Sequence, residues 1–422
     1  MRNCIVQIPL LVILIFSFSG VVGCNPPAPR KGKIVGSSMS PTLKGTHYSI
    51  SCPGCEIEFS CDLEQADQRE TVVCPNCGTS AARNHWTPIA ADPVSVLPNS
   101  QIQRWDVIAF ERTPPAGITS NHELMTKRVV GLPGETIRFE NGNIFANQVL
   151  ISKPLQLQKQ MRVLVCDSKF QSNPSLNWIL TPENKWKFAN GIFQMNSPPT
   201  DGKFNWFGFR YQKNYFRTDD SPAPAAVEDF YGYNQSLSRK LNPMDEVFVE
   251  LNTQLNDGIL GWRFEIQNEL YEFQIDAALS ELQILGGKPD ANPNTKLFEA
   301  GISPPLNPRK PTRIEFSSFD RVLRVLINGN ELWTHLLGGS DSPSPKAKLS
   351  FGANSVGVKF ERIRIWRDLY YFGGKAPNEP SNSTTTPGYF VIGDNVPLSH
   401  DSRHWEQPCV ATENVKGKVI FK

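Results

Sequence analysis

The sequence lacks a surplus of charge of either sign. Its 422 residues include 43 lysines and arginines against 41 aspartates and glutamates, so the formal net charge is only +2. Proteins that bind nucleic acid usually carry a clear excess of basic residues. The composition therefore gives no support to a nucleic-acid partner. Hydrophobic residues make up 39% of the chain, which indicates a folded protein with a substantial core and a length that suits two or three domains.

A hydrophobic run of clear membrane-spanning length is also missing. The chain is apolar from Ile5 to Val22, but the uninterrupted part begins only at Leu10 and is shorter than the ~20 residues that a spanning helix needs. Residues 1–24 are therefore either an uncleaved N-terminal anchor or a lipoprotein signal ending at Cys24, which would carry the lipid. Secretion with complete release is a third interpretation. All three place the rest of the chain outside the cytoplasm.

Histidine is scarce, and none of the six histidines lies in a hydrolase motif. The nucleophile motif G-x-S-x-G is absent as well. A serine hydroxyl needs a neighbouring base to become a nucleophile, and a neutral lysine can replace histidine in that role. The pKa of a free lysine, ~10.4, falls when apolar surroundings disfavour the ammonium form. Lys127 suits this chemistry because it opens the apolar run Val129–Leu132.

Four segments occur in an order that is typical of one protease family. They read GSSMSPTL at 36–43, WDVIAF at 105–110, KRVVGLPGE at 127–135 and GDNVPLSHDSR at 393–403. Together they resemble the conserved boxes of bacterial type I signal peptidases, which are serine endopeptidases with a Ser/Lys dyad. The resemblance implies a β-rich core whose catalysis needs no cofactor.

The resemblance also implies a role for each matching residue. Ser38 would attack the scissile carbonyl, and Lys127 would accept its proton and then donate it to the leaving amine. Ser399 matches the serine whose hydroxyl orients the lysine. The backbone N–H of Ser38 would form part of the oxyanion hole. Gly36 stands where some relatives carry a serine, so this chain lacks that side-chain donor.

Two further groups follow from the same boxes. The residues that match the substrate-binding edge strand are Ile34 and Val35, continued by Gly36, and an extended substrate would lie against them. The residues that match the rigid support of the site, expected to include a buried charge pair, are Asp394, Asp401 and Arg403. The loop after residue 43 departs from the family pattern, which leaves the details of substrate binding open.

Two C-x-x-C pairs lie in an insert at residues 50–80. Cys52 with Cys55 and Cys74 with Cys77 are separated by about 18 residues, the spacing of a tetrahedral Cys4 zinc ribbon. Such a closed site has no position for a catalytic water, so we expect a structural zinc ion. Two disulfides are the alternative, since the compartment is oxidising.

Residues 156–376 form a second, larger insert. Short stretches of alternating apolar and polar residues, joined by turn signals such as Asn328-Gly329, predict a β-sandwich that weakly resembles concanavalin- or laminin-G-like domains. Residues 377–387 read as a linker. Aromatic side chains in this insert favour core packing, with sugar binding as the alternative. The tryptophans in question are Trp178, Trp186, Trp206, Trp262 and Trp333.

The sequence as a whole predicts a mainly β protein with a peptidase core assembled from residues 31–50, 95–155 and 386–422. The expected activity is removal of signal peptides from exported preproteins at the outer face of the cytoplasmic membrane. Preproteins and membrane lipid are the expected partners, and the sandwich could take a glycan or a protein ligand. The alternatives are a membrane-tethered binding protein with a scaffold-only protease core, and a related Ser/Lys protease that cleaves itself or one regulator.

Overall fold

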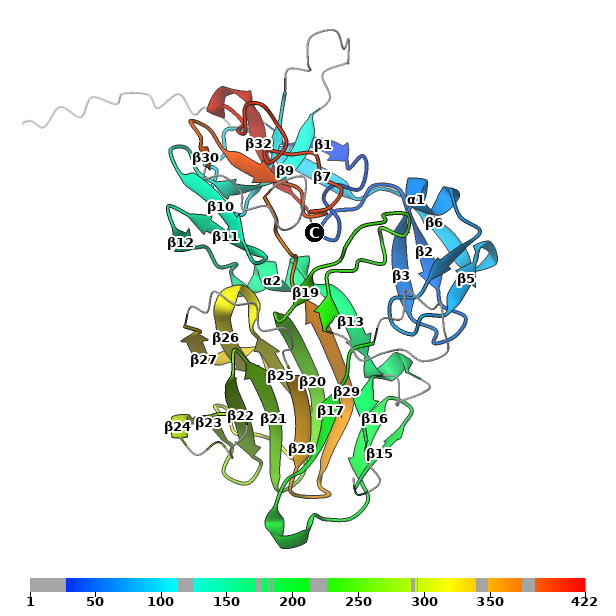
Figure 1. Cartoon of the computed structure of the whole chain (residues 1–422), viewed down its shortest axis with the longest axis vertical. Helices are drawn as coiled ribbons and strands as arrows, with labels where there is room; N and C mark the ends of the chain where they lie inside the picture. The colour runs from blue at the N-terminus through cyan, green and yellow to red at the C-terminus, as the bar shows by residue number, and fades with distance from the viewer. Residues whose placement is uncertain are drawn as a thin grey trace, which may run out of the picture.

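The computed structural model shows a mainly β protein (Figure 1). The residues it describes are 28–112, 124–171, 177–180, 183, 185–212, 226–289, 293, 295–338, 348–373 and 384–421. The expected anchor at residues 1–24, with Cys24, lies outside them, as does most of the expected linker. Within these ranges no helix has both the length and the apolar character that crossing a membrane requires.

One six-stranded sheet unites the beginning, middle and end of the chain. Its strand order is β1-β7-β32-β8-β9-β31. The strands are β1 (Arg30–Lys33), β7 (Pro93–Leu97), β8 (Val107–Phe110), β9 (Met125–Gly131), β31 (Phe390–Ile392) and β32 (Val415–Ile420), with η6 (Thr412–Asn414) before the last. All four residues of β8 are buried because separate hydrophobic clusters cover the two faces of the sheet. The predicted strands around residues 105–110 and 127–131 are thereby confirmed.

A smaller sheet packs beside this one. It consists of β12 (Val149–Leu150), β11 (Asn143–Ala146), β10 (Thr136–Glu140) and β30 (Thr384–Thr385). The predicted hairpin turn is confirmed: Asn141 and Gly142 between β10 and β11 both have positive φ, 49° and 83°. Helix α2 (Leu155–Met161) follows and contributes Met161 to the same core.

The cysteine insert is a small β unit of its own. Strands β3 (Glu58–Asp62), β2 (His47–Ser51) and β6 (Trp86–Ile89) form a three-stranded sheet, and β4 (Thr71–Val73) pairs with β5 (Ser80–Ala82). Helix α1 (Leu63–Asp67) and the 3-10 turn η1 (Arg83–His85) connect them. The unit therefore extends from β2 to β6, a longer segment than residues 50–80, because β2 at its start pairs with β6 at its end.

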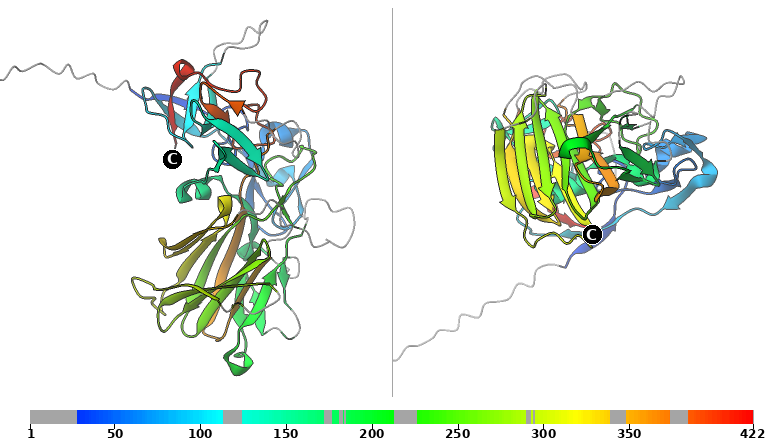
Figure 2. Two further views of the ribbon diagram at one scale, coloured as in Figure 1. Left: turned by 60° about the vertical axis from the view of Figure 1, so that its left-hand side comes forward. Right: turned by 90° about the horizontal axis from the view of Figure 1, so that it is seen from below.

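The large insert is a β-sandwich, which confirms the predicted architecture (Figures 1 and 2). One sheet contains β13 (Val163–Asp167), β15 (Trp186–Ala189), β16 (Ile192–Met195), β20 (Val247–Leu255), β25 (Thr312–Ser317), β26 (Val322–Ile327), β27 (Asn330–Leu336) and β29 (Val358–Arg367). The other contains β14 (Trp178–Ile179), β17 (Asn205–Phe209), β21 (Ile259–Ile266), β22 (Glu269–Asp276), β23 (Glu281–Gly287), β24 (Thr295–Gly301) and β28 (Lys348–Ala353).

Alternating side chains from both sheets fill the core between them. Three of the five tryptophans considered above, Trp178, Trp186 and Trp262, lie in this core, so core packing is the correct interpretation for them. Short 3-10 turns punctuate the insert at η2 (Ser168–Phe170), η4 (Thr200–Gly202) and η5 (Phe319–Arg321).

Two contacts join the sandwich to the peptidase core. Lys153, just before α2, is buried and forms ion pairs with Asp320 at 2.5 Å and with Asp368 at 2.8 Å. In addition, β18 (Val227–Glu228) pairs with β19 (Pro243–Met244), and the chain between them leaves the sandwich toward the peptidase core (Figure 1). These are two of the places at which the large insert is held to the predicted peptidase core.

Candidate active site

Ser38 lies on a tight turn that follows β1. The amide of Ser40 donates to the carbonyl of Ser37 at 3.2 Å, and Met39 is buried at 1% exposure. Gly36 opens the turn with φ of 72°, a conformation that glycine adopts without strain. Gly45 donates to the Gly36 carbonyl at 3.1 Å. The buried methionine and these backbone contacts therefore present the half-buried Ser38 in a defined position.

Lys127 reaches this serine from the adjacent part of the sheet. It lies on β9 opposite Ile108 of β8, and only 4% of it is exposed. Its Nζ donates a hydrogen bond to Ser38 Oγ over 2.7 Å. Burial disfavours the ammonium ion and lowers the pKa of Lys127 to about 8, although nearby Asp401 opposes this effect. A lysine in this setting can accept the proton of the serine hydroxyl.

Two buried ion pairs surround the pair of residues. Arg128, next to Lys127, donates to both carboxylate oxygens of Asp394 over 2.7 and 2.6 Å. Arg403 likewise donates to both oxygens of Asp401, each over 2.8 Å. Arg403 holds the pKa of the Asp401 carboxyl below its usual range despite burial. Both pairs are bidentate, so they fix the directions of the chain segments that carry them.

Ser399 is buried close to residues 36–40, called the nucleophile turn here because the sequence predicts Ser38 as the nucleophile. The described residues contain no direct hydrogen bond between the Ser399 hydroxyl and Lys127. The Ser399 hydroxyl is close enough to Asp401 to help lower the pKa of that carboxyl. A Cβ added at Gly393 would come within 2.2 Å of Ser399 Oγ and 2.4 Å of the Ser38 carbonyl oxygen. Glycine is therefore required at position 393 for these segments to meet. The orienting role of Ser399 stays a prediction.

The residues expected to contact substrate extend from the edge of the six-stranded sheet. Among the described strands, β1 pairs only with β7 and ends at Lys33. The amide of Ile34 still donates to the carbonyl of Asp92 over 3.1 Å, so Val35 is the first residue beyond the paired region. Ile34 is buried, whereas Val35 is 88% exposed. An apolar side chain that is fully accessible beside the nucleophile suits contact with an extended peptide.

Sequence reasoning missed residues that shape this site. Arg128 was part of a recognised segment, yet its pairing with Asp394 depends on two strands meeting across 266 residues of sequence. Asn395 donates its amide N–H to the Ser38 carbonyl over 2.9 Å and its side-chain N–H to the Ser37 carbonyl over 3.0 Å. The available signal was that Asn395 belongs to the fourth recognised segment, 393–403.

The four cysteines of the insert converge. Their sulfur atoms all lie within 4.8 Å of one another, with 3.5 Å between Cys52 and Cys77 and 3.7 Å between Cys55 and Cys74. These separations far exceed the ~2.05 Å of a disulfide, and they are close to the ~3.8 Å expected for thiolates placed ~2.3 Å from one tetrahedral ion. The donor set therefore fits a Cys4 metal site.

The two cysteine turns share one backbone geometry. The amides of Glu56 and Gly78 each donate over 2.9 Å to the carbonyl of the first cysteine of their pair. Both residues have positive φ, 63° and 75°. This repetition gives each turn the same shape and points both pairs of thiols inward.

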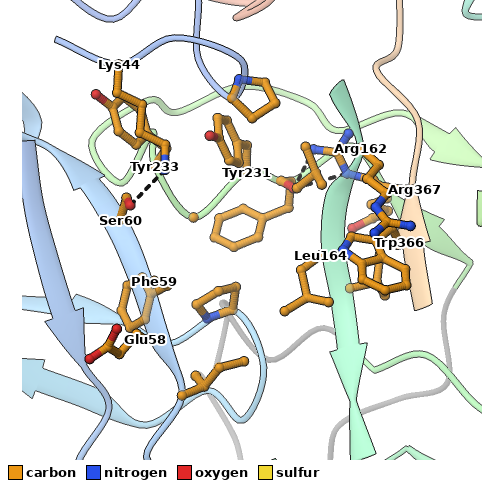
Figure 3. Close-up of a pocket in the computed structure, with 18 of the residues that line it drawn as sticks. Lys44, Glu58, Phe59, Ser60, Arg162, Leu164, Tyr231, Tyr233, Trp366 and Arg367 are labelled. Carbon is orange, nitrogen blue, oxygen red and sulfur yellow. Dashed lines mark hydrogen bonds between the residues drawn. The ribbon is translucent and has the colours of Figure 1, made fainter. Parts of the chain in front are cut away.

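A cavity of about 260 Å³ lies where the three units meet (Figure 3). Its wall includes Lys44, which donates to Ser60 of the cysteine insert over 3.0 Å, together with Arg162 and Trp366 of the sandwich. Tyr231, from the chain between β18 and β19, lines it as well. Ser38 and Lys127 do not belong to this wall, so the cavity is separate from the candidate active site.

Comparison with known proteins supports the resemblance in the first part of the chain. The family model described as "Signal peptidase, peptidase S26" matches residues 8–187, a range that contains Ser38 and Lys127 and ends before Ser399. A protein from Synechocystis sp. described as "Probable signal peptidase I-2" is 22% identical over 95 residues. The match covers 20% of this chain and 44% of that protein, less than half of its length.

Among solved structures, similarity falls on β-sandwich proteins. Galectin LEC-6 of Caenorhabditis elegans is 13% identical, with a TM-score of 0.23, and the match covers 29% of this chain and 82% of that one. Bacillus licheniformis β-glucanase is 8% identical, with a TM-score of 0.30, over 47% and 96% of the two chains. Scores this low carry no argument about function.

Proposed function

We propose that this protein is a membrane-attached type I signal peptidase in which Ser38 is the nucleophile and Lys127 the general base. The observation that carries the proposal is the 2.7 Å hydrogen bond from a buried lysine, whose pKa falls to about 8, to the hydroxyl of Ser38. The match of residues 8–187 to the signal peptidase family supports the same activity.

In this mechanism Ser38 Oγ attacks the carbonyl carbon of the scissile peptide bond while neutral Lys127 accepts the hydroxyl proton. The backbone N–H of Ser38 stabilises the oxyanion, with no side-chain donor from Gly36. Lys127 then protonates the leaving amine, and the C–N bond breaks to leave an ester on Ser38. Water, deprotonated by Lys127, cleaves that ester and restores the hydroxyl.

The proposed substrate is an exported preprotein, cut after small residues at the first and third positions before the scissile bond. The exposed Val35 and the open edge beside β1 offer room for an extended peptide. The apolar run within residues 1–24 would hold the enzyme at the membrane by an anchor or through lipid on Cys24. Substrate and enzyme would then meet at the same surface.

We further propose that the four insert cysteines hold one structural Zn²⁺. Their spacing fits tetrahedral thiolate coordination. The side chain of Asn76 donates to Cys55 Sγ over 3.6 Å, a contact that would hold a ligating thiolate in place. Zinc would be needed for the folding of the insert rather than for the reaction.

The decisive experiment compares cleavage of a preprotein by the full chain and by variants at the dyad. Ser38→Ala and Lys127→Ala should each abolish cleavage while leaving the unfolding temperature near that of the wild type. Ser95→Ala on β7 and Lys418→Ala on β32 are matched controls on neighbouring strands and should retain activity. Substantial cleavage by Ser38→Ala would refute the proposal and favour a binding protein with a scaffold-only core.

A further inference from the structure

Part of the sandwich insert leaves its own domain and reaches the nucleophile turn. We call residues 229–236 the bridging loop; it lies between β18 and β19. Its root is fixed by Arg367 at the end of β29, which is buried and donates to the carbonyl of Phe230 over 2.7 Å and to that of Asp229 over 3.1 Å. The loop is therefore rigidly attached to the sandwich.

The first contact with the nucleophile turn is made by Tyr231. Its hydroxyl shares a 2.6 Å hydrogen bond with the hydroxyl of Ser40, which is fully buried two residues after Ser38. Tyr233 stacks on Tyr231 with ring centroids 5.6 Å apart, and Figure 3 shows both rings beside the cavity. The stack limits the freedom of Tyr231 and so helps to hold its hydroxyl in place.

The second contact is made by Asn234 through an amide pair. Asn234 donates to the side-chain oxygen of Asn395 over 2.7 Å, and Asn395 donates back over 2.9 Å. Both side chains are buried. Asn395 in turn donates to the carbonyls of Ser37 and Ser38. A chain of side-chain hydrogen bonds thus runs from the sandwich insert through Asn395 to the Ser37 carbonyl, and the backbone N–H of Asn395 donates to the carbonyl of Ser38.

The same loop contacts the cysteine insert through different residues. Gln235 exchanges two hydrogen bonds, each of 3.1 Å, with the backbone of Val73. The carbonyl of Tyr233 accepts from the amide of Asp62 over 3.1 Å. These contacts do not involve the nucleophile turn. The loop therefore joins the cysteine insert through one set of residues and contacts the nucleophile turn through another.

We propose that Asn234 and Tyr231 are positioning residues of the nucleophile, so that the sandwich insert is an integral part of the active site. This inference rests on the proposed peptidase function. Asn234 fixes the side-chain amide plane of Asn395, and that amide donates to the carbonyl of Ser37, directly before the nucleophile. The backbone N–H of the same Asn395 donates to the carbonyl of Ser38. Tyr231 fixes the other end of the turn through Ser40. The direction of Ser38 Oγ toward Lys127 and toward substrate follows from both contacts.

Asn234→Ala in the full chain tests the proposal. It leaves the Asn395 side chain free to rotate, and small displacements of a nucleophile cost rate steeply, so kcat should fall about 10- to 100-fold. KM should stay unchanged because the edge of β1 is untouched. The midpoint of the pH–rate profile should also stay unchanged, since the burial of Lys127 is preserved. Tyr231→Phe should lower kcat less, since its hydroxyl contacts Ser40, two residues after Ser38, whereas Asn395 contacts Ser37 and Ser38 themselves.

Two matched controls accompany these variants. Tyr233→Phe removes a buried hydroxyl that has no hydrogen-bond partner among the described residues, directly beside Tyr231. Gln235→Ala removes the two hydrogen bonds between the loop and Val73 of the cysteine insert and leaves the contacts with the nucleophile turn in place. Both should keep the wild-type kcat. Loss of activity in Gln235→Ala equal to that in Asn234→Ala would overturn the proposal, since general loosening of the loop would then explain both.

Hydrogen exchange gives a readout that does not depend on turnover. In Asn234→Ala, the amides of residues 37–40 and of Asn395 should exchange faster, while those of β9 should not change. Wild-type kcat, or unchanged exchange at these amides, would overturn the positioning role while cleavage by the wild type still supports the peptidase. If the wild type cleaves no preprotein, the proposed function fails, and exchange alone decides whether Asn234 fixes the turn.

Discussion

Lys127 should control the pH dependence of cleavage. Its pKa falls from 10.5 to about 8 because burial penalises the ammonium form, which corresponds to about 3 kcal/mol. At pH 7 about one molecule in ten then carries neutral Lys127, against about one in three thousand for a lysine of ordinary pKa. We expect kcat/KM to rise tenfold per pH unit below about pH 8 and to level off above it.

The assay is the initial rate of preprotein cleavage from pH 5.5 to 10, with the Lys127→Arg variant beside the wild type. Arginine keeps the positive charge and cannot be deprotonated in this range, so the variant should be inactive at every pH. A wild-type rate that is independent of pH between 6 and 9, or a midpoint near 10, would refute the reasoning that burial generates the base.

The lowered pKa of Lys127 also makes the stability of the folded protein depend on pH. Because the folded pKa lies below that of the unfolded chain, the unfolded chain binds more protons between pH 8 and 10.5, and stability therefore rises with pH across that window. The cost of burying the ammonium ion is present in full below about pH 8. Lys127→Met removes this cost and should raise the free energy of unfolding by up to about 3 kcal/mol at pH 7. Denaturant unfolding at pH 7 and pH 10 should show the advantage of the variant shrinking as pH rises.

Two further predictions concern structure outside the dyad. Metal analysis of the purified chain should find about one zinc ion per chain. Removal of zinc with a chelator, or the Cys74→Ser variant, should unfold the cysteine insert, as measured by circular dichroism and limited proteolysis. A stable, metal-free protein with two disulfides would contradict this prediction. Asp394→Ala leaves the charge of Arg128 buried without its partner and should destabilise the fold by about 3–5 kcal/mol in denaturant unfolding. Glu299→Ala, at the exposed ion pair with Lys296, should cost far less than Asp394→Ala in the same measurement, and equal losses would refute the argument from burial.

Local patterns predicted much of the secondary structure. The turn residues Asn141 and Gly142 adopt the positive φ that their hairpin requires, and the predicted sandwich strands are present. Such predictions work because the period of apolar residues and the conformational freedom of glycine are properties of short segments. The order of the four motifs also led to Ser38 and Lys127, which the structure brings to 2.7 Å.

The tertiary structure alone decided how the site is supported. Asn234 and Asn395 lie 161 residues apart and belong to different units. Asn395 belongs to a recognised segment, but no pattern in the sequence singles out Asn234. The sequence likewise gave no indication that Arg128 pairs with Asp394. Hydrogen bonds of this kind depend on how sheets and inserts pack against one another, which no local pattern encodes. The sequence by itself therefore determined the strands and which residues could react, whereas only folding determined that a distant insert holds the nucleophile.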